Sequence, residues 1–264
     1  MGKDLTSILA GWDYDPDQPQ VRIVTGDDGR EKLQMRIDLG LLQMELSGRP
    51  DGERPFGFES LLEYYETCAR GQAANGDSFT LDARACAVLF REGLQYYHRY
   101  LALFHLQRFD LVARDTARNL RLFAFVVSHA TRSSDKLQFD QYRPYVTMMH
   151  TRALGSQALA QHDFPAAIEH IDTGIAGIRG FLRDYDQAEG ESTCAELGFL
   201  LNWRRQVEDE RPMGPVERLE QQLNLAVAKE QFEEAARLRD QIRRLRGNHS
   251  TGSSAAGKQP PLPA

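Results

Sequence analysis

The residues best suited to chemistry in this sequence lie in a short polar segment, residues 47–55. It holds two prolines, two glycines and the alternating charges of Arg49, Asp51, Glu53 and Arg54, a composition that predicts an irregular loop. Carboxylates and guanidiniums that converge in a loop can bind a ligand or transfer protons, or they can simply be solvated. No geometry follows from their spacing, so an enzymatic site at this loop stays one alternative, and no catalytic residue can be named.

Other signatures of catalysis and of metal binding are absent from the sequence. It contains no GxxxxGK[ST], GxGxxG, GxSxG or HExxH pattern. The cysteines Cys68, Cys86 and Cys194 are far apart and form no CxxC pair, so neither a disulfide framework nor a zinc site is predicted. We therefore expect no metal and no cofactor.

Composition and charge point to an ordinary globular chain. Of its 264 residues, 41% are hydrophobic and 27% are charged, and the formal net charge is -6. An acidic chain has no global positive field to attract nucleic acid, and the sequence shows neither a signal peptide nor 18 consecutive apolar residues. We expect a cytoplasmic protein without membrane contact and without direct nucleic-acid binding.

The periodicity of apolar residues predicts a mostly α fold that begins with a β-hairpin. Val21 and Ile23, then Leu33, Met35 and Ile37, alternate with polar residues on either side of the turn 25–30. From residue 58 the period becomes helical, with long helices expected near 81–106, 110–128, 143–160 and 165–182. The expected parts are an N-terminal region with hairpin and polar loop (1–57), a helical body (58–211), a C-terminal hairpin (212–246) and a disordered tail (247–264).

A recurring unit marks the turns between paired helices. Phe109, Phe164 and Phe232 each follow the end of one helix and are followed, three residues on, by two small or apolar residues. Such small residues let two antiparallel helices approach closely. The first two copies resemble tetratricopeptide repeats, separated by an insertion assigned to 131–141, which implies helical hairpins that form a groove for peptides or partner helices.

Tyrosines 96, 97 and 100 form an aromatic cluster within one of these predicted helices. They could stack on bases in a nucleic-acid binder. Tyrosines at helical spacing more often lie in the core or line a groove, and we favour that interpretation.

The C-terminal segment carries the most specific pattern in the chain. After the break at Pro212 and Pro215, one predicted helix is followed by a turn at 229–231 and a returning helix. The ordered elements are Leu219, Leu223 and Ala226, then Phe232, then Ala235-Ala236, Leu238-Arg239-Asp240 and Ile242. This segment resembles the UVR motif of the UvrB and UvrC subunits of the bacterial excision nuclease, of McsA and of ClpC-type ATPases.

The resemblance implies an antiparallel two-helix hairpin that associates with another UVR hairpin or with a partner protein. The helicase, ATPase and zinc-binding patterns of those relatives are absent from this sequence. We therefore predict a non-enzymatic adaptor that binds a protein partner or a second copy of itself. The alternatives are an accessory factor of nucleotide excision repair that contacts UvrB, UvrC or DNA, and an undetected enzyme at the N-terminal loop. The expected partner-binding residues are Leu219, Leu223, Ala226, Phe232, Ala235, Ala236, Leu238, Arg239, Asp240 and Ile242.

Overall fold

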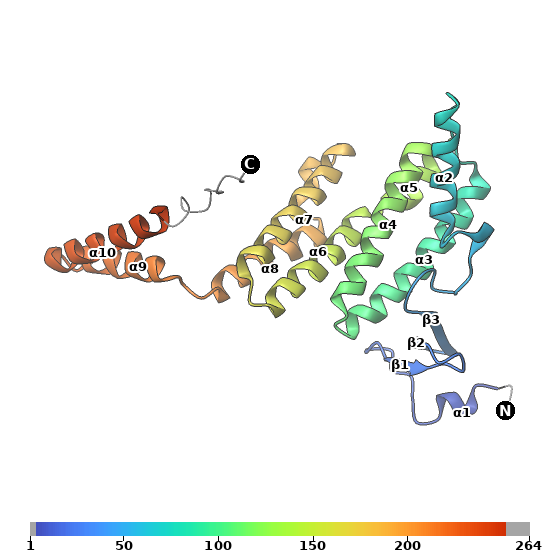
Figure 1. The fold of residues 1–264 in the computed structure, drawn as a ribbon, viewed down its shortest axis with the longest axis horizontal. Coiled ribbons are helices and arrows are strands. Elements are labelled where there is room, and N and C mark those ends of the chain that lie inside the picture. The colour runs from blue at the N-terminus through green and yellow to red at the C-terminus, as the bar shows by residue number, and fades with distance from the viewer. Residues whose placement is uncertain (1–3, 252–264) are drawn as a thin grey trace, which may run out of the picture. The chain divides into compact units, whose positions relative to one another are not determined.

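The computed structural model describes residues 4–251 and shows a mostly helical protein with a small N-terminal sheet (Figure 1). Its contacts divide the chain into two compact units, residues 1–209 and residues 210–264. The predicted fold class is confirmed, because strands occur only near the start of the described chain and a helix pair closes it.

The N-terminal sheet has three antiparallel strands, one more than the predicted hairpin. After a short helix α1 (Thr6–Leu9), the strands β1 (Val21–Thr25), β2 (Glu31–Ile37) and β3 (Gly40–Glu45) pair in the order β1-β2-β3. β1 and β2 are the two expected strands. The third escaped prediction because the adjacent Leu41 and Leu42 interrupt the alternation that marks a strand.

One face of the sheet is covered by the helical body. Leu33 of β2 and Met44 of β3 face each other in the strand register, and both are buried in the same cluster as Tyr100 and Leu103. The polar loop 47–55 and the 3-10 turn η1 (Pro55–Gly57) then lead to α2 (Leu61–Ala74). The hydroxyl of Ser60 caps α2 by accepting a hydrogen bond from the backbone N–H of Glu63.

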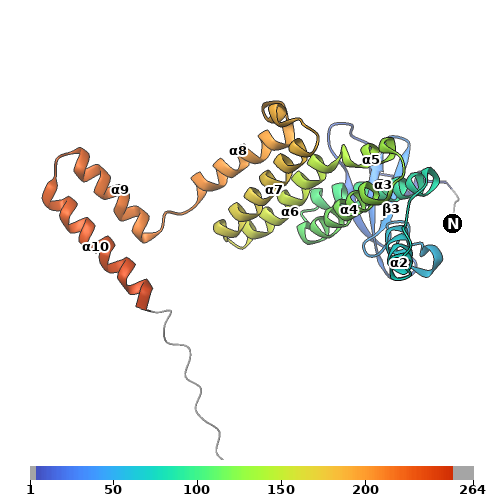
Figure 2. The same cartoon turned by 90° about the horizontal axis from the view of Figure 1, so that it is seen from above.

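The body consists of helices packed in succession along the chain. α3 (Ala83–His105) packs on α4 (Phe109–His129), α4 packs on α6 (Arg143–Ala160), and α6 packs on α7 (Phe164–Asp184), as Figure 2 shows. These are the four long helices predicted from the sequence. The segment expected as an insertion is also helical, as α5 (Ser133–Asp140), because it buries Phe139 against α4.

Small residues set how closely the later helices approach. After the turn η2 (Ala188–Ser192) comes α8 (Ala195–Glu210), and its Trp203 lies where a side chain at Gly155 of α6 would be. Likewise, a Cβ atom added at Gly174 of α7 would lie 2.8 Å from Cγ2 of Thr151 on α6. Neither glycine could be replaced without moving its neighbour.

The second unit is a two-helix hairpin of α9 (Pro215–Ala228) and α10 (Phe232–Thr251). α10 continues through Thr251 and so includes residues 247–251 of the expected tail. The rest of the expected tail lies outside the described residues. None of the described helices combines the length and the apolar character needed to cross a membrane.

Candidate interaction site

The three phenylalanine turns share one backbone conformation. In each, the helix ends four residues before the phenylalanine, and the next helix begins at the phenylalanine itself. The residue two positions before the aromatic ring has a positive φ, as seen at Gln107 (56°), His162 (57°) and Glu230 (57°). Non-glycine residues adopt this left-handed conformation at some cost, so the turn is held by its hydrogen bonds and packing.

The same backbone hydrogen bond closes each turn. The N–H just before the phenylalanine donates to a carbonyl five residues earlier, as expected for a Schellman motif. The pairs are Arg108 to Leu103, Asp163 to Ala158 and Gln231 to Ala226, each at 2.9 Å. The repeat inferred from the sequence is thus one local structure used three times.

The predicted partner-binding residues divide into an inner and an outer set. The inner set lies between α9 and α10: Ala226, Ala235, Leu238 and Ile242 are buried, and Leu219 and Leu223 are partly buried against this cluster. The hairpin therefore covers most of its own apolar seam. The outer set is exposed and consists of Phe232, Ala236, Arg239 and Asp240.

Phe232 differs from its two counterparts in what covers it. Phe109 packs edge-on against Phe104, with ring centroids 5.4 Å apart, and Phe164 packs against the main core. Phe232 is 69% exposed. All three turns have the same conformation. The phenylalanine ring is packed in the two turns of the body, but it projects into solvent in the C-terminal unit. Three carboxylates, those of Glu230, Glu233 and Glu234, surround it in a shallow hollow.

The charged loop 47–55 is bound to the helical body by a buried network. The Arg99 guanidinium of α3 makes two hydrogen bonds to the Asp115 carboxylate of α4, at 2.6 and 2.8 Å. Its remaining nitrogen donates to the backbone oxygens of Glu45 and Gly48, at 2.9 and 2.8 Å. Neither Arg99 nor Asp115 was singled out as a site residue from the sequence, because their partners are far away along the chain.

A second part of the same network is centred on Glu92, which is fully buried. Its carboxylate accepts hydrogen bonds from the backbone N–H groups of Leu61 (2.8 Å) and Leu62 (3.2 Å) at the start of α2, and it forms an ion pair with Arg118. Arg49 of the loop lies 3.7 Å from it. The side chains that suggested chemistry thus do converge with other charged groups. The ion pairs Arg99–Asp115 and Glu92–Arg118 join α3 to α4, and the other contacts join the loop or the start of α2 to α3.

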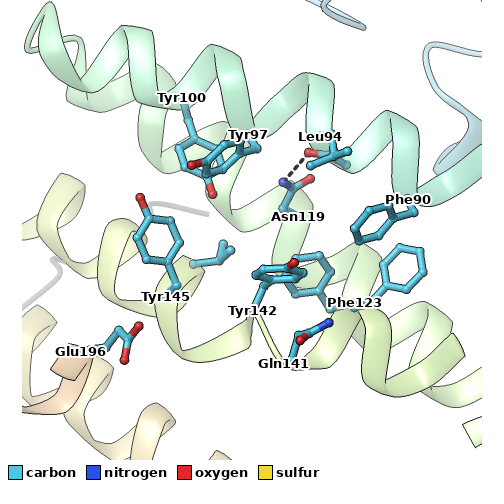
Figure 3. Close-up of a pocket in the computed structure, with 13 residues that line it drawn as sticks. Phe90, Leu94, Tyr97, Tyr100, Asn119, Phe123, Gln141, Tyr142, Tyr145 and Glu196 are labelled. Atoms are coloured by element: carbon cyan, nitrogen blue, oxygen red, sulfur yellow. Dashed lines mark hydrogen bonds between the residues drawn. The ribbon is translucent and has the colours of Figure 1, made fainter. Parts of the chain in front are cut away.

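The body contains an aromatic pocket of about 460 Å³ between α3, α4, α5 and α6, with Glu196 of α8 at its rim (Figure 3). Tyr97, Tyr100 and Tyr145 gather at one end. Phe90, Phe123 and Tyr142 line the other end, where Phe139 packs against Phe90 and Phe123. Burial raises the pKa of Tyr145 and of Tyr100, so both phenols stay neutral near pH 7.

The tyrosine cluster was expected to lie in the core or to line a groove, and Tyr97 and Tyr100 line the pocket. Tyr96 is instead buried, with the Arg118 guanidinium 4.0 Å and the Arg99 guanidinium 4.8 Å from its ring centre. The remaining pocket residues were not predicted, since they come from five separate helices, α3, α4, α5, α6 and α8, and from the turn before α6. Across the part of the chain that the structure describes, no three His, Cys, Asp or Glu side chains are grouped so that they could hold a metal ion.

Comparison with known proteins gives one match. The profile of the family described as UvrB/uvrC motif matches residues 215–248, the range in which α9 and α10 form their hairpin. No curated protein matches the chain, and no solved structure does. The C-terminal hairpin is therefore a UVR motif, and this protein is a UVR motif-containing protein.

Proposed function

We propose that the protein is a non-enzymatic adaptor whose UVR hairpin binds a second protein through the exposed face around Phe232. The observation that carries the proposal is the contrast among the three equivalent turns. Phe109 and Phe164 are packed within the body, whereas the ring of Phe232 is exposed. Aromatic side chains are enriched in protein–protein interfaces, and Phe232 is the turn phenylalanine of the three that keeps its ring free for such a contact.

The charged residues around Phe232 indicate the chemistry of the complementary surface on the partner. The carboxylates of Glu230, Glu233 and Glu234 surround Phe232, and Arg237 contributes the one cation among the side chains that line this hollow. The complementary surface is an apolar pocket with basic residues at its rim. Along α10, the exposed Ala236 and Arg239 follow Phe232 at intervals of four and three residues, so they extend the same helical face.

The buried charge network supports the non-enzymatic part of the proposal. Glu92, Arg99 and Asp115 are fully buried and are engaged by backbone groups or by oppositely charged side chains. A substrate would have to displace those contacts before it could use the charges. The network is better suited to holding the N-terminal region on the body than to catalysis.

The second candidate is an accessory factor of nucleotide excision repair, favoured by the family match itself. In that case the partner of the protein is UvrB, UvrC or DNA. The two candidates differ in the identity of the partner, so one experiment can separate them.

The test compares the full chain with two single variants, Phe232→Asp and Leu39→Asp. Leu39 is 92% exposed in the turn between β2 and β3, so Leu39→Asp introduces the same charge at an exposed apolar site of the other unit. Each protein is immobilised and exposed to a differently tagged copy of the chain, to purified UvrB and to purified UvrC. We expect the wild type and Leu39→Asp to retain one of these partners and Phe232→Asp to lose it.

Equal retention by all three proteins would contradict the docking role of Phe232. Retention of UvrB or UvrC would select the repair candidate, and retention of only the second copy would select self-association. Salt-dependent binding of single-stranded DNA by the wild type and by Phe232→Asp alike would contradict an adaptor that acts through protein contacts alone.

A further inference from the structure

The aromatic pocket of the body has one charged side chain in its lining, that of Glu196, among the residues that the structure describes. The rest of the lining is mainly aromatic and aliphatic, with the amides of Asn119 and Gln141. Asn119 is already engaged, because its amide donates to the backbone oxygen of Gly93 at 3.0 Å and accepts from Arg118 at 3.1 Å. The carboxylate of Glu196 is therefore the main electrostatic feature that a ligand would meet.

Glu196 forms no ion pair with any cation in the described part of the chain. Among the residues with described positions, its one hydrogen-bond donor is the thiol of Cys194, at 3.6 Å from the carboxylate oxygen, and a thiol is a weak donor. Glu196 stands in the first turn of α8, where the helix dipole favours a negative charge. It is only partly buried, so the carboxylate keeps most of its capacity for a cationic partner.

Three tyrosines, Tyr97, Tyr100 and Tyr145, line the pocket together with Glu196. Tyr97 and Tyr100 meet at 88° with centroids 5.5 Å apart, and Tyr97 and Tyr145 are tilted by 54° at 6.3 Å. Figure 3 shows Tyr145 between this pair and Glu196. The faces of aromatic rings carry negative electrostatic potential and attract cations, so rings and carboxylate favour the same kind of ligand.

We propose that this pocket binds the side chain of a lysine or arginine from an extended segment of a partner protein. The apolar stem of such a side chain would lie among Phe90, Phe123 and Tyr142, with its cationic group among the tyrosines and Glu196. A volume of about 460 Å³ lies within the usual range of ligand pockets. This surface belongs to the other unit from Phe232 and goes beyond the proposed hairpin function, although the choice of a polypeptide over a free amine rests on the adaptor role.

Replacement of Arg152 should change ligand binding in the opposite direction to replacement of Glu196, which makes the proposal testable. The Arg152 guanidinium lies 4.3 Å from the centroid of Phe104 and 4.8 Å from that of Phe199. Arg152 follows Tyr145 of the pocket by two turns on the same face of α6. It forms no ion pair among the described residues, and its charge reaches Tyr145. A positive charge at this position opposes a cationic ligand, so its removal should tighten binding, whereas removal of the Glu196 charge should weaken it.

The experiment measures binding of labelled Gly/Ser-rich peptides to the full-length protein by fluorescence anisotropy. The peptides differ only at a central residue, which is Lys, Arg or Gln. We expect the Lys and Arg peptides to bind better than the Gln peptide. Glu196→Gln should weaken their binding roughly fivefold, as for a partly exposed ion pair, and Arg152→Gln should strengthen it roughly twofold. Leu94→Trp, which narrows the pocket, should weaken the binding of all three peptides.

Asp110→Asn is the matched control for Glu196→Gln, because it also removes a carboxylate from the first turn of a helix, α4. It should leave peptide binding unchanged, as should Phe232→Asp, so a failure of this proposal is distinct from a failure of the hairpin proposal. Equal binding of the Gln peptide, or an equal effect of Glu196→Gln and Arg152→Gln, would overturn the cation site. Binding of free choline as tight as that of the peptides would overturn the polypeptide occupant.

Discussion

Arg99 and Asp115 form a two-pronged ion pair between α3 and α4, and each side chain is only 1% exposed. A buried charge that loses its partner is costly, since neither water nor another counter-ion replaces it. The remaining guanidinium hydrogen bonds of Arg99 hold the backbone of Glu45 and Gly48. The pair therefore links the core of the body to the loop after the sheet.

Asp115→Ala should lower the free energy of unfolding by about 3–5 kcal/mol, as for other broken buried pairs. Urea denaturation followed by circular dichroism measures this change. The control is Asp110→Ala, which removes an exposed carboxylate 3.8 Å from Arg108 and should cost less than about 1 kcal/mol. Equal losses in the two variants would show that burial of the Arg99–Asp115 pair contributes nothing specific.

In the hairpin, Leu238→Ala should lower the stability, whereas Phe232→Ala should leave it almost unchanged. Leu238 is buried between α9 and α10, and truncation of a buried leucine costs about 2–5 kcal/mol. Phe232 is exposed, so its truncation should change stability by less than about 0.5 kcal/mol. Hydrogen exchange of the α9 and α10 amides should rise in Leu238→Ala and stay unchanged in Phe232→Ala. Increased exchange in both would mean that the Phe232 ring is part of the hairpin core.

Gly174→Ala should destabilise the body through its contact with Thr151. The added Cβ would collide with the Thr151 side chain, 2.8 Å from Cγ2 and closer still to Oγ1. Overpacking of this kind typically costs about 1–3 kcal/mol. In the double variant Gly174→Ala, Thr151→Ala both of those atoms are gone, so thermal denaturation should show partial recovery. Additive losses would indicate that the steric contact is not the cause.

Acidification should destabilise the body through His150. Burial is the main cause that lowers the pKa of His150 below its usual 6.5, and its Nδ1 lies 2.9 Å from the hydroxyl of Thr116. Because the folded pKa is lower than the unfolded one, the unfolded chain binds more protons as the pH falls below about 6.5. Stability should therefore decrease from pH 7 to pH 5.

The control for this prediction is His150→Gln, which removes the titrating group. Urea midpoints measured from pH 7 to pH 5 should fall less steeply in this variant than in the wild type. His98, whose pKa burial also lowers, remains in both proteins and contributes equally to both curves. Identical slopes would show that His150 does not contribute to the acid sensitivity.

The sequence alone determined the local structures of this protein. The apolar period predicted β1, β2 and the four long helices of the body, since these signals depend on neighbouring residues within a strand or a helix. The same is true of the three turns, where Phe109, Phe164 and Phe232 mark the start of a helix. The UVR motif was also identified locally, from ordered residue types within one hairpin.

Tertiary structure alone decided which of these local features is exposed. Phe164 and Phe232 follow the same turn conformation, yet one packs into the main core and the other does not. Whether a side chain is exposed depends on which other elements pack against it, and those elements are distant in the sequence. For the same reason the sequence did not predict that Arg99 would meet Asp115, or that Glu196 would approach the tyrosines of α3 and α6. The sequence gives the type of each charged and aromatic side chain, but which of these side chains meet depends on how the helices pack.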